Sequence, residues 1–177
     1  ARVLVYSTER LEKNDLPASI FELVDSKWKG QVGWAPQNGS FQAFVTALRT
    51  TIGEEKTKTW LEGMIANEVQ AYPKNTPIVQ AAGNGDIKIG LVNHYYLWRF
   101  RAENPDFPAE NQYTDPGGAG ALINVAGIGL MKSAKTNTAA LRFVEYLLAE
   151  KAQNYFATQT NEYPLNEKVN PRPELPL

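Results

Sequence analysis

The 177 residues are 43% hydrophobic and 21% charged, enough chain to bury the core of one large domain or two small ones. A net charge of -1, from 18 Lys and Arg against 19 Asp and Glu, gives no reason to expect nucleic acid or an anionic surface as a partner. With no Cys and one His, disulfides, thiolate nucleophiles and multi-histidine metal sites are excluded. No apolar run reaches the roughly 18 residues of a membrane-spanning helix. The sequence starts at Ala1 without an initiator Met or a signal peptide, which indicates a processed protein or a fragment.

Strand and helix patterns alternate along the first half of the sequence. Apolar side chains spaced three and four apart between Phe41 and Ile52 predict a helix, and Gly53 is placed to end it. Thr76 and Pro77 are typical of a helix start. The expected strands are residues 2–6, 31–35, 68–72 and 87–92, and the expected helices are residues 17–24, 41–52, 54–67 and 76–83. This alternation predicts an α/β fold, in which sites form where strands end and helices begin.

The second half of the sequence is less regular. Asn104 to Gly118 is polar and rich in proline, and Ala121 to Met131 is expected to form a further strand. One helix should follow, because its apolar residues share a face: Leu141, Val144, Leu147, Leu148, Tyr155 and Phe156. Residues 161–177 contain four prolines and little periodicity, which predicts an extended loop.

Polar side chains and backbone donors gather at the expected helix starts. Asn38, Gly39 and Ser40 precede the first long helix, so backbone N–H groups, a hydroxyl and an amide would converge on an oxyanion there. The alternative is an ordinary turn and helix cap. Asn75 and Asn93 lie at two further crossings between strand and helix, where an amide can donate to an anion. Each of these asparagines is equally explained as a turn residue.

The most informative stretch contains two adjacent tyrosines and the only histidine. His94, Tyr95 and Tyr96 follow the buried strand of residues 87–92. A phenolate oxygen is a hard, charged donor suited to ferric iron, and a bound cation holds the phenolate at neutral pH although a free tyrosine has a pKa of about 10. A turn from strand to helix would aim both phenols at one ion. The alternative is that both rings pack at the sheet edge with their hydroxyls in water, and that His94 is an ordinary hydrogen-bonded histidine.

Enzyme signatures are missing from the sequence. No serine lies in a Gly-x-Ser-x-Gly elbow, and there is no phosphate-binding loop and no dinucleotide fingerprint. A binding protein is therefore favoured over an enzyme.

Several segments carry a family resemblance. They are Lys27 to Pro36 (KWKGQVGWAP), Asn38 to Phe44 (NGSFQAF), Gly90 to Tyr96 (GLVNHYY), Asn124 to Gly127 and Phe143 to Leu148. Together they resemble the periplasmic ferric-ion-binding proteins of bacterial iron ABC transporters over nearly the whole chain. The resemblance implies a lobe of the type II periplasmic-binding-protein fold, with three α/β/α layers around a mixed sheet. It also implies binding of ferric iron and no catalysis.

The resemblance implies a ligand set as well. Adjacent tyrosines bind Fe(III) in the family, which corresponds to Tyr95 and Tyr96 here. A synergistic anion, phosphate or carbonate, completes the coordination in the family and is held by a small-residue turn at a helix start and by asparagines. The corresponding residues are Asn38, Gly39, Ser40, Asn75 and Asn93. His94 is expected to be a neighbour of the iron and not a ligand.

Only part of the family's two-lobe arrangement is expected in this sequence. By resemblance, residues 1–125 start in the hinge strand and form most of the second lobe. Residues 126–177 cross back to the first lobe, whose first part is missing, and end in an extended tail. The apolar stripe of residues 141–156 would then lack its partners, which predicts self-association.

The resemblance places this function in the periplasm, or on a lipid anchor in a Gram-positive source. The expected partner is the ABC permease in the inner membrane, with no nucleic acid and no membrane span. An alternative on the same fold is a binding protein for a different solute, an oxyanion or a small organic acid, with the tyrosines only lining the cleft.

Overall fold

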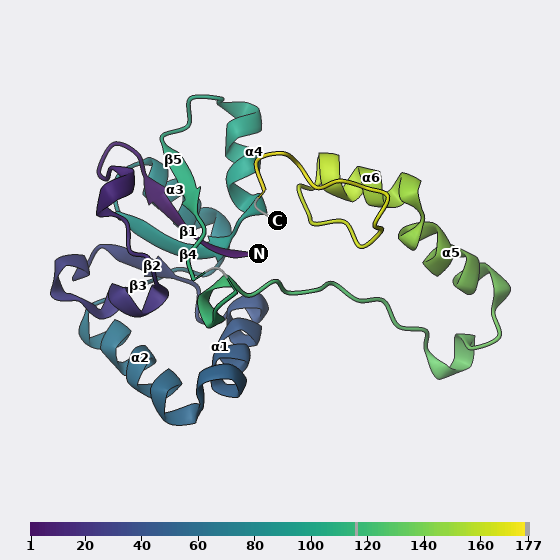
Figure 1. Ribbon diagram of the computed structural model, residues 1–177, viewed down its shortest axis with the longest axis horizontal. Coiled ribbons are helices and arrows are strands. Elements are labelled where there is room, and N and C mark those ends of the chain that lie inside the picture. Colours follow the sequence, from purple (N-terminus) through teal and green to yellow (C-terminus); the bar gives the residue numbers. More distant parts are fainter. Residues whose placement is uncertain (116, 176–177) are drawn as a thin grey trace. The chain divides into compact units, whose positions relative to one another are not determined.

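Five short strands form one mixed sheet in the first part of the chain (Figure 1). The computed structural model describes residues 1–115 and 117–175, and the chain divides into two units, Ala1–Asn124 and Val125–Leu177. The strands are β1 (Arg2–Ser7), β2 (Val32–Trp34), β3 (Gln70–Ala71), β4 (Ile89–Asn93) and β5 (Ala109–Gln112). Their order across the sheet is β3-β2-β4-β1-β5. β2 is parallel to β3 and β4, whereas β1 is antiparallel to β4 and β5, so the sheet is mixed as expected.

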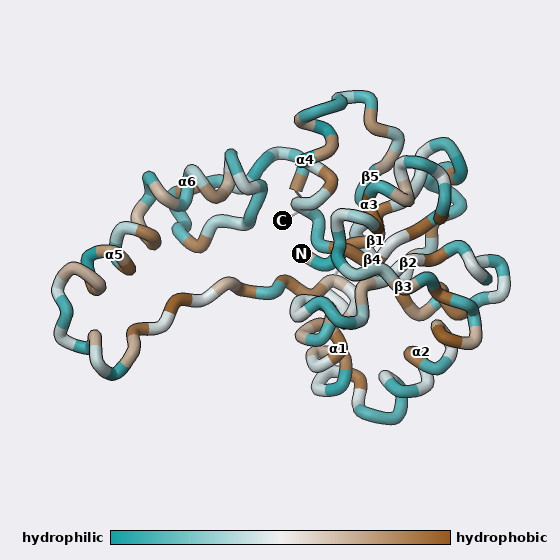
Figure 2. Tube along the Cα trace, turned by 180° about the vertical axis from the view of Figure 1, so that it is seen from behind, coloured by the Kyte–Doolittle hydropathy of each residue, from teal (hydrophilic) through white to brown (hydrophobic). Residues whose placement is uncertain are grey.

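Helices cover both faces of this sheet. The helices of the first unit are α1 (Gly39–Ile52), α2 (Glu54–Ala66), α3 (Asn75–Gly83) and α4 (Tyr95–Glu103). Successive side chains of β1 point to opposite faces, so Leu4 and Tyr6 join one buried cluster with α1 and α2, and Val3 and Val5 join a second with α3 and α4. Figure 2 shows hydrophobic residues in the central strands of the sheet. The three layers around a mixed sheet confirm the expected α/β/α architecture.

The end of α1 is the one that the sequence predicts, whereas the helix starts at Gly39, two residues before the expected start at Phe41. Asn38 caps the helix, because its side-chain oxygen accepts a hydrogen bond from the backbone N–H of Ser40 at 3.0 Å. Gly53 follows the last turn with a φ of 92°, a conformation that favours glycine, and the helix ends there. The apolar stripe is buried through Phe41 and Phe44.

Close packing holds α3 against β4. A side-chain carbon at Gly90 would collide with Ile78, so the glycine allows the helix to lie directly on the strand. The start of α3, with Asn75, is thereby fixed beside the end of the sheet.

The second unit contains two helices, α5 (Thr138–Leu148) and α6 (Glu150–Gln159). The side chain of Gln153 ties the following segment to them: its Nε2 donates to the carbonyl of Leu147 at 2.7 Å, and its Oε1 accepts from the N–H of Leu165 at 2.6 Å. The described residues from 161 onward form neither helix nor strand, as expected. The described helices are all too short or too polar to cross a bilayer.

Three expectations about secondary structure were wrong. Ala121 to Met131 is irregular beyond a short 3-10 turn at Ala119–Ala121. The carbonyl of Leu122 accepts a hydrogen bond from the N–H of Arg2 at 2.9 Å, but the described residues do not extend this contact into the ladder that a strand needs. The single helix expected across residues 141–156 is interrupted at Ala149, whose ψ of 154° is extended. Side chains from α6 and the tail take over the last carbonyls of α5 there. The expected helix at residues 17–24 is a 3-10 helix, Ile20–Val24.

One strand was not expected at all. β5 lies in the polar, proline-rich stretch and pairs with β1, with Tyr6 opposite Glu110. Its register is set by β1 and not by any apolar alternation of its own, so the sequence pattern carried no signal for it.

Candidate metal and anion site

Three helix starts lie at one edge of the sheet. β2, β3 and β4 are mutually parallel, so their carboxyl ends meet there, and α1, α3 and α4 each begin shortly after one of them. The positive ends of the three helices therefore face the same side of the lobe. All the tyrosines, asparagines and small residues predicted for the site belong to these three junctions.

Asn93 joins two of these junctions by hydrogen bonds. Its Nδ2 donates to the hydroxyl oxygen of Tyr95 at 3.0 Å and to Oγ of Ser40 at 3.3 Å. Ser40 in turn donates from Oγ to Oδ1 of Asn38 at 2.6 Å. The structure thus brings Asn38, Ser40, Asn93 and Tyr95, which come from the starts of α1 and α4, into one connected cluster.

Tyr95 and Tyr96 are the first two residues of α4. Their ring centroids are 4.7 Å apart with the planes inclined by 34°, so the two phenol rings lie side by side. Side chains of adjacent residues within a helix point about 100° apart. At the first turn of α4, directly after a strand, the side chains of Tyr95 and Tyr96 nevertheless point in similar directions.

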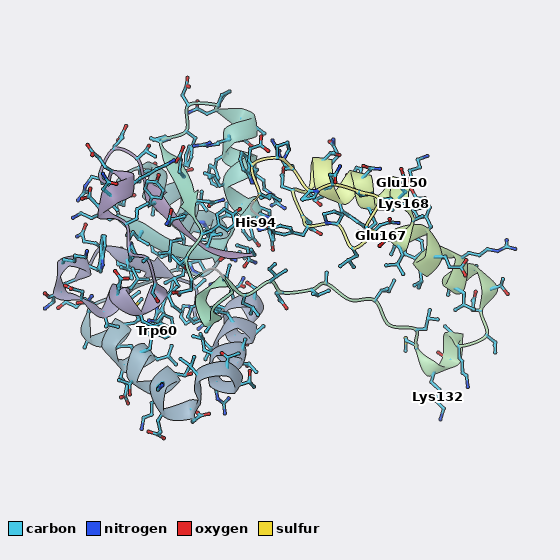
Figure 3. The ribbon with its side chains drawn as sticks, in the orientation of Figure 1. Trp60, His94, Lys132, Glu150, Glu167 and Lys168 are labelled. Atoms are coloured by element: carbon cyan, nitrogen blue, oxygen red, sulfur yellow. The ribbon has the colours of Figure 1, made fainter. Side chains whose placement is uncertain are left out.

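His94 is turned toward the beginning of β1. It is 2% exposed, and its Nδ1 lies 2.7 Å from the amino nitrogen of Ala1. Its ring packs edge-on against Tyr95 at 5.5 Å. Figure 3 shows His94 where the sheet meets α4. It is a neighbour of the tyrosine pair.

Asn75 and Gly39 occupy the remaining predicted positions. Asn75 is 1% exposed at the start of α3, and neither atom of its amide has a hydrogen-bond partner among the described residues. The described contacts do not connect it to the Asn93 cluster. Gly39 opens α1, and a side-chain carbon there would meet no atom within 4 Å, so the protein leaves space beside this backbone. The amide of Asn75 fits a site that receives a small polar ligand, because a buried amide without a partner is costly.

Arg2 is a site residue that the sequence analysis missed. Its guanidinium donates from Nη1 to Oδ1 of Asn93 and from Nη2 to the carbonyl of Leu91, both at 3.2 Å. It also lies over the rings of Phe41 and Phe44, at 5.3 and 5.4 Å from their centroids. The sequence feature that could have pointed to Arg2 is its position as a charged residue directly before the apolar run Val3 to Tyr6.

The electrostatics of Arg2 favour negative charge in this site. Burial lowers the pKa of Arg2 from 12.5 to about 10, and the nearby Tyr95 and Tyr96 offset part of that effect. The guanidinium therefore stays positive at neutral pH although it is 3% exposed. A buried cation of this kind stabilises phenolates or a bound anion beside it.

Other donor sets are not available in the described part of the chain. Residues 1–115 and 117–175 contain no group of three or more His, Asp or Glu side chains that could hold a metal ion. A surface pocket of about 210 Å³ lies beyond β2 and β3, lined by Pro36, Gln37, Ala71, Tyr72 and Pro73, and it does not include the tyrosine pair. The chemistry offered by this lobe is two adjacent phenols, hydrogen-bond donors at helix starts and a buried guanidinium.

A sheet with helices on both faces and polar groups at the carboxyl ends of its parallel strands defines a solute-binding lobe. Residues 1–176 match the family of bacterial extracellular solute-binding proteins, and the chain belongs to that family. Its fold is that of a lobe of the type II periplasmic binding proteins. The family and its relatives are binding proteins and not enzymes.

Several relatives of the chain are named as ferric iron-binding proteins. It is 34% identical over 177 residues to the major ferric iron-binding protein of Neisseria meningitidis, a match covering 96% of this chain and 51% of the relative. Iron-bound HitA from Pseudomonas aeruginosa superposes with a TM-score of 0.91 at 31% identity, covering 99% of this chain and 57% of HitA. The Trichodesmium protein IdiA (FutA), in complex with iron and citrate, gives 0.85 at 27% identity, covering 97% and 56%. The chain thus spans about half the length of the curated relatives it matches.

Proposed function

We propose that this chain binds ferric iron together with a synergistic anion. Tyr95 and Tyr96 provide two phenolate ligands, and the anion is held by Asn38, Gly39, Ser40, Asn75 and Asn93. The observation that carries the proposal is the amide of Asn93, which donates both to Tyr95, at 3.0 Å, and to Ser40, at 3.3 Å. One side chain therefore links the proposed metal ligands to the proposed anion seat.

The donor chemistry suits a hard trivalent cation. Two phenolates bring two negative charges, and the anion brings more, so a nearly neutral complex forms without any thiolate or histidine cluster. Neutral N–H and O–H donors at helix starts bind the anion without competing for the metal. Phosphate or carbonate fits this donor set, because several oxygens can accept hydrogen bonds while others face the iron.

The rest of the coordination shell comes from a second lobe in this proposal. Two phenolates and one anion leave about half of an octahedral shell to other ligands. Residues 1–125 serve as most of one lobe, beginning in its hinge strand, and residues 126–177 contribute to the other. The whole protein delivers iron to an ABC permease from the periplasm, or from a lipid anchor in a Gram-positive source.

Titration with ferric nitrilotriacetate tests the ligand assignment. Phenolate bound to Fe(III) absorbs visible light by charge transfer, so the wild-type chain should turn coloured, and Tyr95→Phe or Tyr96→Phe should each abolish the band. Each variant removes one charged ligand and keeps the ring that packs. Tyr155→Phe is the matched control, because this phenol is 58% exposed on α6 and belongs to the other unit. Full colour and iron uptake in both site variants would contradict the assignment.

A second candidate is a different solute on the same site. The neutral donors of Ser40, Asn75 and Asn93 would hold an oxyanion or a small organic acid without any metal, and one structural neighbour was solved in complex with iron and citrate. The same titration separates the two functions, since an organic acid gives no visible band. Saturable binding of citrate with no colour from ferric nitrilotriacetate would favour the organic acid.

A further inference from the structure

We propose that Arg2 is a positioning residue that fixes the orientation of the Asn93 side-chain amide, so that its donor end and not its acceptor end faces the bound iron and anion. The inference rests on the proposed function and adds a residue that neither touches nor ligates the cargo. It concerns β1, a strand that is buried along its whole length.

The pairing of two strands places Arg2 and Asn93 together. They are directly opposite in the antiparallel register of β1 and β4, and Nη1 of Arg2 donates to Oδ1 of Asn93 at 3.2 Å. The guanidinium is held independently, by the carbonyl of Leu91 and by the rings of Phe41 and Phe44. Arg2 therefore has a fixed place from which to act on Asn93.

The chemistry of the two groups decides the orientation. An amide has one acceptor end and one donor end, and in a symmetric setting either can face the site. A guanidinium can only donate, so the Asn93 oxygen must face Arg2, and Nδ2 is then directed to Tyr95 and Ser40. A phenolate or an anion can only accept, so the reverse orientation would set an oxygen against it. The orientation enforced by Arg2 is the one in which Asn93 stabilises both.

This role differs from a general effect of positive charge. A charge alone would act on the phenolates whether or not Asn93 is present, whereas a positioning role disappears when the amide is removed. A double-mutant cycle between the two residues separates them. The measured quantity is ferric affinity by citrate competition, followed through the visible band of the 177-residue chain.

The first test compares two polar replacements of Arg2. Arg2→Lys keeps a group that can only donate and should keep most of the affinity. Arg2→Gln has both a donor and an acceptor end, so it no longer selects one orientation of Asn93. We expect it to lose about tenfold, equivalent to about 1.4 kcal/mol. In an Asn93→Ala background, Arg2→Gln should cost much less than this. Arg10→Met, an arginine that contacts Gly85 and Gln31 outside the site, is the control that should leave affinity unchanged.

Two outcomes would overturn the inference. One is equal affinity of Arg2→Gln and Arg2→Lys, and the other is the same loss from Arg2→Gln with and without Asn93. If Arg2→Gln does not fold by near-ultraviolet circular dichroism, Asn93→Asp decides instead. It keeps an acceptor for Arg2 but has no donor for the site, so it should bind at least as weakly as Asn93→Ala, and wild-type binding would refute the inference. A wild-type chain that never develops the band would refute the proposed function itself, whatever the Arg2 variants do.

Discussion

Replacing Asn75 by alanine should make the unliganded lobe more stable and its anion binding weaker. Asn75 is 1% exposed, and both polar atoms of its amide lack a partner among the described residues. A buried polar group without a hydrogen bond costs about 1 to 3 kcal/mol. The small cavity left by truncation cancels part of the gain, so we expect a net stabilisation of about 1 kcal/mol.

Asn67 is the matched control for this substitution. It is also a buried asparagine, 8% exposed, but its Nδ2 donates to the carbonyls of Leu23 at 2.9 Å and Asp25 at 2.8 Å. Asn67→Ala leaves these carbonyls without their donor and should destabilise the lobe by about 1 to 3 kcal/mol. The same chemical change therefore has opposite signs at the two positions if Asn75 is kept for a ligand.

Tryptophan fluorescence is the suitable assay, because the four tryptophans, at 28, 34, 60 and 98, all lie in the first unit. In buffer without phosphate, a gain of about 1 kcal/mol in a chain of this size raises the Tm by roughly 2 to 4 °C. Added phosphate should stabilise the wild type, by about 2.7 kcal/mol at a hundred times its Kd, and stabilise Asn75→Ala less. Destabilisation of Asn75→Ala to the same extent as Asn67→Ala would refute the reasoning, as would an unchanged response to phosphate.

Three further predictions concern pH, the second lobe and association. Burial and a hydrogen bond to Glu110 raise the pKa of Tyr6 to about 12. The stability that this phenol contributes is therefore complete below about pH 10 and is lost as the pH rises through about 12. Urea unfolding should show that the free energy of unfolding falls less at alkaline pH in Tyr6→Phe than in the wild type. Citrate should strip iron more readily from this chain than from one extended by the half that its relatives have in addition, and equal resistance would show that one lobe is sufficient. Sedimentation velocity should reveal self-association that weakens in Phe143→Ser, because Phe143 and Leu148 of α5 are at least half exposed; a monomer at all concentrations would contradict this.

Local patterns in the sequence determined most of the elements that carry the predicted site, although α4, which begins with the two tyrosines, was not among the helices expected from the sequence. The apolar stripe from Phe41 to Ile52 and the glycine after it define α1, since a helix is encoded by neighbours within one or two turns. The same holds for the buried strand before the tyrosine pair and for the alternation of strand and helix that implies the layered fold. The junctions of strand and helix where the candidate ligands lie could therefore be located without any coordinates.

Tertiary structure decided which distant residues meet. Arg2 and Asn93 are 91 residues apart, and only the antiparallel register of β1 with β4 sets one against the other. Strand β5 forms without an apolar pattern because it pairs with β1 over four residues. Residues 121–131 were expected to form a strand, but among the described residues their contact with β1 is the single bond from the N–H of Arg2 to the carbonyl of Leu122, and no strand forms. A strand forms only where another strand pairs with it, and the burial of an amide such as that of Asn75 depends on the residues that pack around it. Neither is written in the local sequence, because both depend on contacts that form only when remote segments come together.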